Sequence, residues 1–373
     1  MPKAFLLTQR LWRCVMKNNW IRDTLRNFTP YKVAPIAETH VINANENYLN
    51  VLSIPSIKEE LLQRMESWKP SVYPKPMADE LRETLADYMN LQPENIIAGN
   101  GGDEMITYFL GTFLNPGDRI LVHAPTFDMY QLGAETLGAS AITVKDLPGY
   151  RRDRKGLLKA VRTYQPKVTI LCNPNNPTGE LLPKSYIEEV VQAADNLVLV
   201  DEAYMEFAAD ESVISLISKY DNLVVLRTLS KCFALAGLRC GYLAAQKELI
   251  DAICRIKAPY NLNTFTQLMA VTVLHHREEI FKVRDHIVSE RRRMIKALEE
   301  IPEITVYPSE TNFILLLAGE KQERIFEALR QADILVKIYR NNPMIPGGFR
   351  ITVTTPEIND RVIAIIRREA GHA

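Results

Sequence analysis

The 373-residue sequence lacks any apolar run long enough to cross a bilayer. A crossing needs about 20 apolar residues, whereas the longest run, Phe313–Ala318, is typical of a buried strand. Lysine and arginine together number 45, which equals the number of aspartates and glutamates. A chain without net charge creates no field that attracts nucleic acid or an acidic membrane. The composition therefore predicts neither a membrane protein nor a nucleic-acid-binding protein.

Cysteine is scarce, and none of the five cysteines forms a C-x-x-C pair or has a histidine at zinc-ligand spacing. This pattern predicts free thiols in a reducing cytosol rather than disulfides or a metal site. We therefore expect a cytoplasmic protein without a bound metal. Cys172, Cys232 and Cys240 lie beside the polar motifs described below, where small buried packing residues are the expected interpretation.

Acidic residues are absent from the first 22 positions, which contain five lysines and arginines. The short apolar stretch Ala4–Leu7 is not long enough for the core of a secretory signal. We expect residues 1–15 to be a disordered N-terminal extension.

Strand-like apolar runs alternate with helical stretches such as Pro183–Asp195 and Arg284–Glu300. This alternation predicts a doubly wound, largely parallel α/β sheet, and the length suits two domains. We expect a large domain over residues 46–262 and a smaller α/β domain made of residues 16–45 and 263–373, with the active site in the cleft between them. Arg291, Arg292 and Arg293 are expected on the solvated face of the second helix.

Lys231 follows the strand-like run Leu223–Leu226 and precedes Arg239 by eight positions. A primary amine forms an imine with an aldehyde only when it is deprotonated. It therefore needs a dry site near other positive charge, where its pKa falls. The segment is typical of a Schiff-base lysine, beside which Thr228, Ser230 and Arg239 would hold a phosphate.

Two further strand-like runs end in polar residues. One leads into NPNNPTG, Asn173–Gly179, and the other, Leu197–Val200, leads into Asp201 and Tyr204. Buried strands seldom end in an unpaired carboxylate. The nitrogen of a pyridine ring would be a partner for Asp201, because an ionised carboxylate keeps that nitrogen protonated. Tyr204 and Asn176 are placed to donate hydrogen bonds to a phenolic oxygen of the same ring.

These motifs resemble those of the pyridoxal-phosphate (PLP) dependent aminotransferases of fold type I, class I and II. The resemblance covers nearly everything after about Asn27. It is strongest to the histidinol-phosphate aminotransferases, in ANENY (Ala44–Tyr48), GNGGDE (Gly99–Glu104), NPNNPTG, DEAYMEF (Asp201–Phe207), TLSKCFALAGLRCGY (Thr228–Tyr242) and FRITVTTPEIND (Phe349–Asp360). It implies a fold type I PLP-dependent transferase with a large, mostly parallel sheet domain and a smaller α/β domain.

The resemblance also implies a role for each matching residue. Lys231 would bind the cofactor aldehyde and shuttle protons, with Asp201 and Tyr204 as the other catalytic residues. Phe127 would stack on the pyridine ring, and Tyr73 would reach the cofactor phosphate of the neighbouring subunit, so that the active site would require a homodimer. The full set expected to bind PLP is Gly101, Gly102, Asp103, Phe127, Asn176, Asp201, Tyr204, Thr228, Ser230, Lys231, Arg239 and Tyr73.

Substrate binding is expected from Arg350, Asn176 and Lys337. Arg350 matches the arginine that grips the substrate α-carboxylate, because its planar fork makes two parallel hydrogen bonds that lysine does not reproduce. A substrate phosphate needs a further cation. Lys337 stands where the family has an arginine, with Arg340 close by, and lysine binds phosphate as a point charge.

The implied reaction is a ping-pong amino transfer between histidinol phosphate and 2-oxoglutarate, with glutamate as the other amino compound. Lys337 leaves an aromatic amino-acid aminotransferase open as an alternative. A lyase of the threonine-phosphate decarboxylase type shares the NPNNPTG motif and the lysine, but its lysine segment resembles this one less closely. A transcription regulator with a PLP domain would need a DNA-binding module of roughly 70 to 100 residues. The N-terminal part here is too short to hold one.

Overall fold

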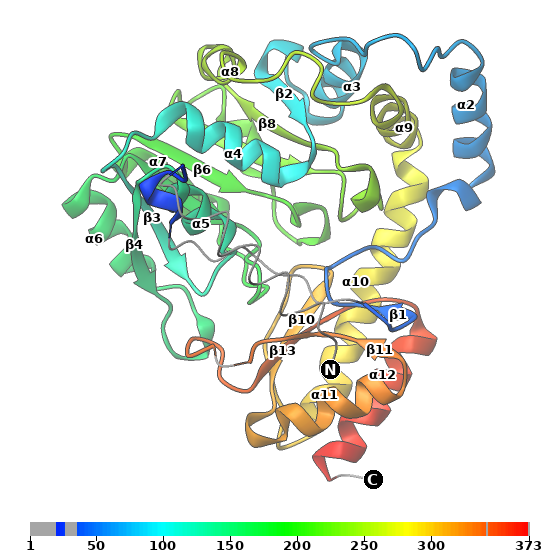
Figure 1. Ribbon diagram of the computed structural model, residues 1–373. Coiled ribbons are helices and arrows are strands. Elements are labelled where there is room, and N and C mark those ends of the chain that lie inside the picture. Colours follow the sequence, from blue (N-terminus) through cyan, green and yellow to red (C-terminus); the bar gives the residue numbers. More distant parts are fainter. Residues whose placement is uncertain (1–19, 27–35, 341, 372–373) are drawn as a thin grey trace.

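The computed structural model describes residues 20–26, 36–340 and 342–371. The chain is organised around a seven-stranded sheet and a four-stranded sheet (Figure 1). The expected extension at residues 1–15 lies outside the described residues. Within those ranges, no helix combines the length and the apolar character that a membrane crossing requires.

The large sheet has the strand order β2-β8-β7-β6-β5-β3-β4. Strand β8 is antiparallel to β2 and to β7, and the neighbouring strands from β7 to β4 are all parallel. The bounds of the strands are β2 (Ile96–Gly99), β3 (Arg119–Ala124), β4 (Ser140–Lys145), β5 (Val168–Cys172), β6 (Leu197–Asp201), β7 (Leu223–Thr228) and β8 (Gly241–Ala245). The sheet is therefore the mostly parallel one that the sequence predicts.

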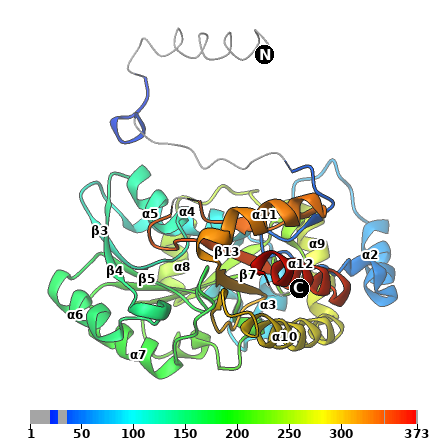
Figure 2. The same cartoon turned by 90° about the horizontal axis from the view of Figure 1, so that it is seen from below.

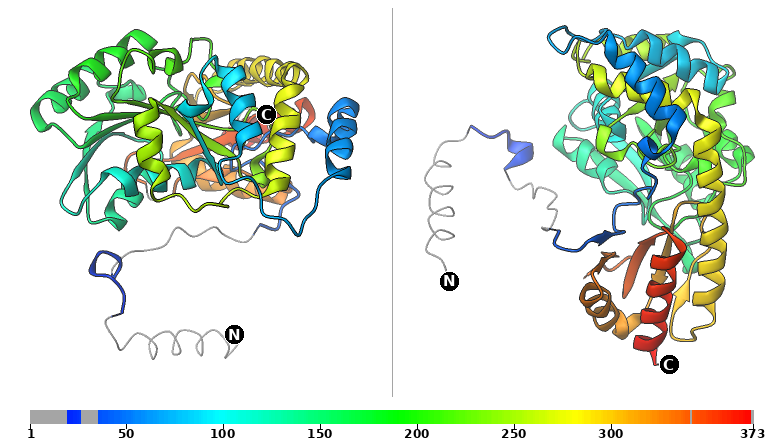
Figure 3. Two further views of the ribbon diagram at one scale, coloured as in Figure 1. Left: turned by 90° about the horizontal axis from the view of Figure 1, so that it is seen from above. Right: turned by 90° about the vertical axis from the view of Figure 1, so that its right-hand side faces the viewer.

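Helices cover both faces of this sheet (Figures 1 and 3). One core holds side chains of α4 (Gly101–Phe113), α5 (Met129–Thr136) and α8 (Lys247–Cys254). The other holds side chains of α6 (Arg154–Tyr164) and α7 (Lys184–Ala193). In β6, Leu199 enters the first core, whereas Val198 and Val200 enter the second. A strand buried on both faces reads as a continuous apolar run, which is why β5, β6 and β7 were predictable.

A third group of helices joins the large sheet to the small one. Helices α2 (Pro55–Glu66) and α3 (Asp79–Met89) pack against α9 (Thr264–His275). The long helix α10 (Arg277–Glu299) then runs on to the small sheet (Figures 1 and 3). It begins before the predicted start at Arg284.

Arg291 on α10 overturns one expectation, because its side chain is 1% exposed rather than solvated. It donates hydrogen bonds to the carbonyl oxygens of Phe207 and Thr311 and forms an ion pair of 2.9 Å with Glu310. The prediction is wrong here because α10 passes between two parts of the fold, and the buried guanidinium finds acceptors from both. Its neighbour Arg292 is exposed, as expected.

The small sheet has the order β12-β13-β10-β9 and is antiparallel. Its strands are β9 (Thr305–Val306), β10 (Phe313–Leu317), β12 (Lys337–Ile338) and β13 (Gly348–Thr352). Helices α11 (Gln322–Gln331) and α12 (Pro356–Ala370) pack side by side at this end of the molecule (Figure 2). A separate two-stranded sheet lies beside it. Strand β1 (His40–Val41) pairs there in parallel with β11 (Ile334–Leu335).

Candidate active site

Three of the predicted motifs meet at the carboxyl edge of the large sheet. Strand β5 ends directly before the loop Asn173–Gly179, β6 ends at Asp201, and β7 ends at Thr228, three positions before Lys231. In an open α/β sheet, this edge is where ligands bind. The topology therefore gathers side chains that are far apart in the sequence.

The amine of Lys231 donates a hydrogen bond of 2.8 Å to the carbonyl oxygen of Ala44. Burial is the largest cause that lowers its pKa to about 8, and the positive charges of Arg350 and Arg239 lower it further, while Glu46 acts in the opposite direction. Half of the amine is thus neutral near pH 8. A neutral amine is the form that attacks an aldehyde.

Asp201 is 4% exposed and has two hydrogen-bond donors. The Tyr130 hydroxyl donates to one carboxylate oxygen at 2.6 Å, and the Ala203 N–H donates to the other at 3.0 Å. Burial raises the pKa of this carboxyl to about 6, and the two donors oppose that rise. A protonated ring nitrogen beside this carboxylate would supply the cation that favours its ionised form.

The start of α4 forms a cradle for an anion. Gly101 opens the helix with a φ of +82°, and a Cβ atom there would lie 2.5 Å from Nη2 of Arg239. A Cβ on Gly241 would lie 2.4 Å from the carbonyl carbon of Gly101. Arg239 in turn forms an ion pair of 2.9 Å with Asp103. Glycine at both positions therefore leaves room beside exposed N–H groups of a helix N-terminus, where phosphates bind.

Two hydroxyl groups complete this cradle. The Thr228 hydroxyl donates to that of Ser230 at 2.9 Å, and Nη1 of Arg239 lies 3.5 Å from the Ser230 oxygen. Helix α4 begins at Gly101 itself. The glycines are therefore the first residues of the helix rather than a turn before it.

The phenolic oxygen and the face of the expected pyridine ring also have candidate partners. Tyr204 is buried, and burial raises the pKa of its phenol, so the hydroxyl stays a donor at neutral pH. It accepts a hydrogen bond of 2.8 Å from the side-chain amide of Asn45. Phe127 packs edge-on against Tyr130, with ring centroids 5.6 Å apart, so it lies beside the partner of Asp201.

Arg350 and Asn176 are in direct contact, although they come from the small and large sheets. Nη1 of Arg350 donates to the side-chain oxygen of Asn176, and Nη2 donates to the Asn43 carbonyl at 2.7 Å. Nε of Arg350 is buried without a hydrogen-bond partner among the described residues. An arginine held on one edge in this way keeps donor capacity for a ligand.

Lys337 lies directly opposite Arg350 in the antiparallel pair of β12 and β13. Side chains of directly opposed residues lie on the same face of a sheet, so the two cations share one face. The positive charge of Lys337 also acts on Asp128, where it opposes the rise in the carboxyl pKa caused by burial. The nearby Arg340 instead forms a two-point ion pair with Glu323, at 2.8 and 2.9 Å.

Tyr73, which was predicted to bind the cofactor, does not contact the other described residues of the site. Its side chain is 76% exposed and stacks on Tyr260, with ring centroids 4.5 Å apart. Among the described residues, no hydrogen bond or ring contact joins it to Lys231 or to the cradle. The other predicted residues lie along the carboxyl edge of the large sheet or on the facing edge of the small one.

Two residues that reasoning from the sequence missed are Tyr130 and Asn45. Tyr130 lies three positions after Phe127, and Asn45 lies inside the recognised motif Ala44–Tyr48, but no role was assigned to either. Their position in or next to a recognised motif was the only local pattern in the sequence that could have indicated a role. Their hydrogen bonds to Asp201 and Tyr204 depend on contacts over 71 and 159 positions.

A cavity of about 300 Å³ is lined in part by Ile42 and Glu46, which flank Ala44 in the chain. Its lining includes Glu46, Tyr48, Ala236 and Thr354. These residues come from the N-terminal segment, from the loop that follows Lys231 and from the end of the small sheet. The cavity therefore has one carboxylate and one aromatic ring on its wall.

Comparison with known proteins agrees with this geometry. The family model for aminotransferase class I and II matches residues 39–366. The histidinol-phosphate aminotransferase of Thermoanaerobacter sp. (strain X514) is 37% identical over 349 residues, which cover 93% of this chain and 98% of that protein. The histidinol-phosphate aminotransferase of Caldanaerobacter subterraneus subsp. tengcongensis is 36% identical over 94% of this chain and 99% of its own.

A solved structure has the same fold. The histidinol-phosphate aminotransferase of Sinorhizobium meliloti, in complex with pyridoxal-5'-phosphate, has a TM-score of 0.86. It is 22% identical, and the match covers 95% of this chain and 99% of that one.

The doubly wound sheet, the lysine amine and the anion cradle define a fold type I PLP-dependent aminotransferase. The chain belongs to the class I and II aminotransferase family. Within that family it belongs with the histidinol-phosphate aminotransferases. The predictions of the fold class, of an aminotransferase and of pyridoxal 5'-phosphate as cofactor are confirmed.

The residues present fit this cofactor. Glycine at position 101 lets the Arg239 guanidinium lie against the start of α4, and glycine at position 241 lets β8 approach the same backbone closely. The buried carboxylate of Asp201 suits a ring nitrogen, and the amine of Lys231 has the lowered pKa that condensation with an aldehyde requires.

Proposed function

We propose that this enzyme transfers an amino group between L-histidinol phosphate and 2-oxoglutarate by a ping-pong mechanism in histidine biosynthesis. The observation that carries the substrate proposal is the pairing of Lys337 with Arg350 across β12 and β13. Histidinol phosphate carries a phosphate ester where an amino acid carries its α-carboxylate. A single subsite must therefore accept a carboxylate in one half of the reaction and a dianion in the other.

The two cations suit this double task. The fork of Arg350 matches a planar carboxylate, and a second positive charge on the same face adds to the attraction of a phosphate dianion. The names of the relatives, which are 36 to 37% identical over nearly the whole chain, support the same substrate. Asn176 would fix the orientation of Arg350, because it accepts a hydrogen bond from Nη1.

When bound, PLP supplies an aldehyde that condenses with amines and a protonated ring that withdraws electrons from the substrate α-carbon. Lys231 would take a proton from that carbon with its neutral amine and return it on the cofactor side. Asp201 would keep the ring nitrogen protonated. Tyr204 and Asn176 would donate to the ring oxygen, and Phe127 would cover the ring face.

The phosphate of the cofactor would be held by this chain's own cradle. Gly101, Gly102 and Asp103 would offer backbone N–H groups at the start of α4. Thr228 and Ser230 would donate through their hydroxyls, and Arg239 would supply the charge. The half-exposed position of Arg239 leaves its guanidinium accessible from the cleft.

We also propose that the enzyme works as a homodimer in the cytoplasm. The exposed, stacked pair of Tyr73 and Tyr260 supports the dimer, since Tyr73 lies outside the site of its own chain. In this arrangement Tyr73 would reach the cofactor phosphate in the neighbouring subunit. Residues 46–262 would form the domain that binds the cofactor, and residues 16–45 and 263–373 the domain that brings Arg350 and Lys337.

Steady-state kinetics test the substrate proposal. The purified enzyme is supplied with 2-oxoglutarate, and glutamate formation is followed with L-histidinol phosphate, phenylalanine or tyrosine as amino donor. The proposal expects kcat/KM for histidinol phosphate to exceed the other two by about a hundredfold or more, the scale of one missing charged contact. A preference for phenylalanine or tyrosine would make the enzyme an aromatic aminotransferase instead. Release of carbon dioxide from threonine phosphate would favour the lyase.

A further inference from the structure

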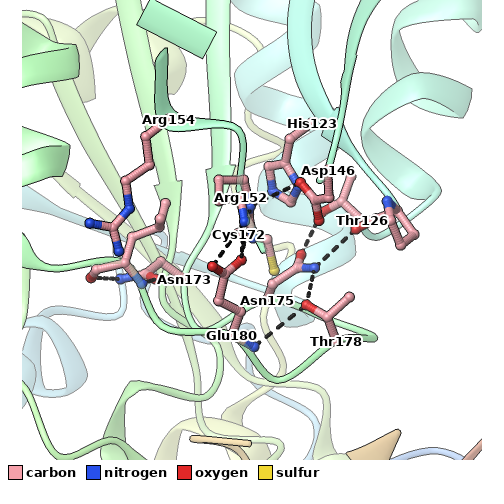
Figure 4. A network of polar contacts seen from close by, with 12 residues as sticks. His123, Thr126, Asp146, Arg152, Arg154, Cys172, Asn173, Asn175, Thr178 and Glu180 are labelled. Carbon is pink, nitrogen blue, oxygen red and sulfur yellow. Dashed lines mark hydrogen bonds and ion pairs between the residues drawn. The ribbon is translucent and has the colours of Figure 1, made fainter. Parts of the chain in front are cut away.

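Four charged or titratable residues form a buried network behind the loop Asn173–Gly179, and the proposed mechanism uses none of them. They are His123 on β3, Asp146 directly after β4, Arg152, and Glu180 directly after the loop. The side chains of His123, Asp146 and Arg152 are at most 2% exposed. Figure 4 shows Arg152 between Asp146 and Glu180, with His123 beside Asp146.

Arg152 joins the two carboxylates. Its Nε lies 3.3 Å from Oδ1 of Asp146 and 3.3 Å from Oε2 of Glu180. Its backbone N–H donates to both oxygens of Glu180, at 3.0 and 3.1 Å. Removal of one partner from a buried ion pair leaves an uncompensated charge, which is strongly unfavourable. The position of Glu180 is therefore tied to that of Arg152.

The protonation of Asp146 and His123 decides which of the groups around Arg152 carry a negative charge. Burial, with the negative charges of Glu180 and Asp153, raises the pKa of Asp146 to about 7 although Arg152 lowers it. Burial and Arg152 hold the pKa of His123 well below its usual value, so this ring is neutral. Glu180, which pairs with the side chain of Arg152 and accepts from its backbone N–H, is therefore a second counter-charge of Arg152 besides Asp146.

The network continues into the loop that carries Asn176. The backbone N–H of Asn175 donates to the Glu180 carbonyl at 2.8 Å. The Asn175 side chain accepts from the Thr126 hydroxyl at 2.9 Å and donates to the hydroxyl of Thr178 at 2.8 Å. The residue before Asn176 is thus held on both its backbone and its side chain, as Figure 4 shows. Asn176 itself contacts Arg350.

The amount of unsatisfied polarity argues against a role in stability alone. Among the described residues, both ring nitrogens of His123, both carboxylate oxygens of Asp146 and all three guanidinium nitrogens of Arg152 lack a hydrogen-bond partner of good geometry. Such groups are rare in protein interiors and call for a specific explanation. Apolar residues of similar volume in place of a buried ion pair are often neutral or stabilising. The network around Arg152 instead holds the Asn173–Gly179 loop in one conformation.

We propose that Arg152 is a positioning residue that, together with Glu180 and Asp146, fixes the Asn173–Gly179 loop. The fixed loop places Asn176 so that it contacts both Arg350 and the oxygen of the cofactor ring. This inference rests on the proposed function through the role of Asn176. The network acts through Asn175 and Glu180 rather than through a residue assigned to the substrate or the cofactor.

The pH titration of the cofactor absorbance in the resting holoenzyme tests the proposal. A hydrogen bond from Asn176 to the ring oxygen stabilises the anion and lowers the pKa of this transition. Arg152→Lys keeps the charge but loses the planar fork, and Glu180→Gln keeps the shape but loses the charge. Both are expected to raise the midpoint by about one pH unit, the scale of one hydrogen bond to a charged group. Both are also expected to lower kcat about tenfold.

Two controls separate positioning from general stability. Asn222→Ala removes a side chain that donates to the carbonyls of Val191, Ala194 and Asn196, ahead of β7 at the other end of the sheet. It should lower the melting temperature without moving the absorbance midpoint. In an Asn176→Ala background, Glu180→Gln should shift the midpoint no further, because coupled residues are not additive.

An unchanged midpoint in Glu180→Gln, with a loss of melting temperature like that of Asn222→Ala, would overturn the proposal. An additive shift in the Asn176→Ala background would overturn it as well. Glu180→Gln decides the matter even if Arg152→Lys does not fold. Failure of the proposed function is seen separately, in a wild-type enzyme that binds the cofactor but does not transaminate histidinol phosphate.

Discussion

Tyr130 donates a hydrogen bond of 2.6 Å to the buried carboxylate of Asp201. This contact stabilises the ionised carboxylate in a place where burial raises its pKa to about 6. Tyr130 also packs edge-on against Phe127, so it ties the residue expected on the ring face to the residue expected at the ring nitrogen. The relationship makes Tyr130 a determinant of the charge on Asp201.

Tyr130→Phe should therefore raise the pKa of Asp201 above about 6, since one of two donors to the ionised form is lost. A carboxyl with a higher pKa is protonated up to a higher pH. The acidic limb of the kcat profile should move upward by roughly one unit, and kcat should fall about twofold at pH 7 and about tenfold well below pH 6. Stopped-flow or steady-state rates from pH 5 to pH 9 provide the measurement. An acidic limb that stays in place would show that Tyr130 has no effect on Asp201.

Cofactor capture by the apoenzyme should depend on pH through Lys231. Burial and two arginines lower the pKa of its amine from 10.5 to about 8. The neutral fraction, and with it the rate of capture, should rise about tenfold per unit below pH 8 and level off above it. Because the unfolded lysine keeps its proton up to higher pH, this group adds stability as pH rises from about 8 toward 10.5. A rate that keeps rising to pH 10 would contradict the lowered pKa.

Gly101→Ala should weaken cofactor retention by about tenfold or more, since the added methyl group would meet the Arg239 guanidinium at 2.5 Å and displace the main cation of the cradle. Gly117→Ala is a matched control, because its φ of +89° imposes similar backbone strain while its Cβ meets no described atom within 4 Å. The control should lose stability by about 1 kcal/mol yet keep the cofactor. Equilibrium dialysis measures retention, and equal losses in both variants would refute the steric argument.

Lys337→Ala should raise KM for histidinol phosphate about tenfold while it changes KM for glutamate much less, because the phosphate carries the extra charge. Lys337→Arg should preserve or improve binding of the phosphate. Arg340→Ala is the neighbouring control. Arg340 is held by Glu323, and its loss should leave both KM values nearly unchanged. If Arg340→Ala instead of Lys337→Ala selectively impaired histidinol phosphate, the assigned phosphate cation would be wrong.

Local patterns in the sequence predicted a large part of this structure. Strands β5 and β6 fall at the expected apolar runs, because both faces of each strand are buried. The polar residues that follow them, Asn173–Gly179 and Asp201, reach one edge as expected because parallel strands share their carboxyl end. A polar residue directly after an apolar strand is a local pattern in the sequence, and this pattern is enough to predict which residues meet at the site.

Contacts between distant segments had no such signal. The hydrogen bond from Lys231 to Ala44 spans 187 positions, and that from Arg350 to Asn176 spans 174. Arg291 was misplaced for the same reason, since a run of three arginines on a helix is locally a solvated face. Its acceptors, Phe207 and Thr311, are supplied by other parts of the chain. The network around Arg152 is likewise assembled only by the fold.

The most direct test of the account is a single half-reaction. The holoenzyme is mixed with L-histidinol phosphate without any keto acid, and the cofactor absorbance near about 420 nm, typical of a PLP imine, is followed with time. The account predicts rapid loss of this band as the amino group passes to the cofactor, much faster than with phenylalanine or tyrosine. Lys231→Ala should lack the band before the substrate is added, because it has no amine at this position to form the imine. A faster reaction with phenylalanine or tyrosine would contradict the substrate assignment, and the absence of the band in the purified protein would contradict the cofactor chemistry itself.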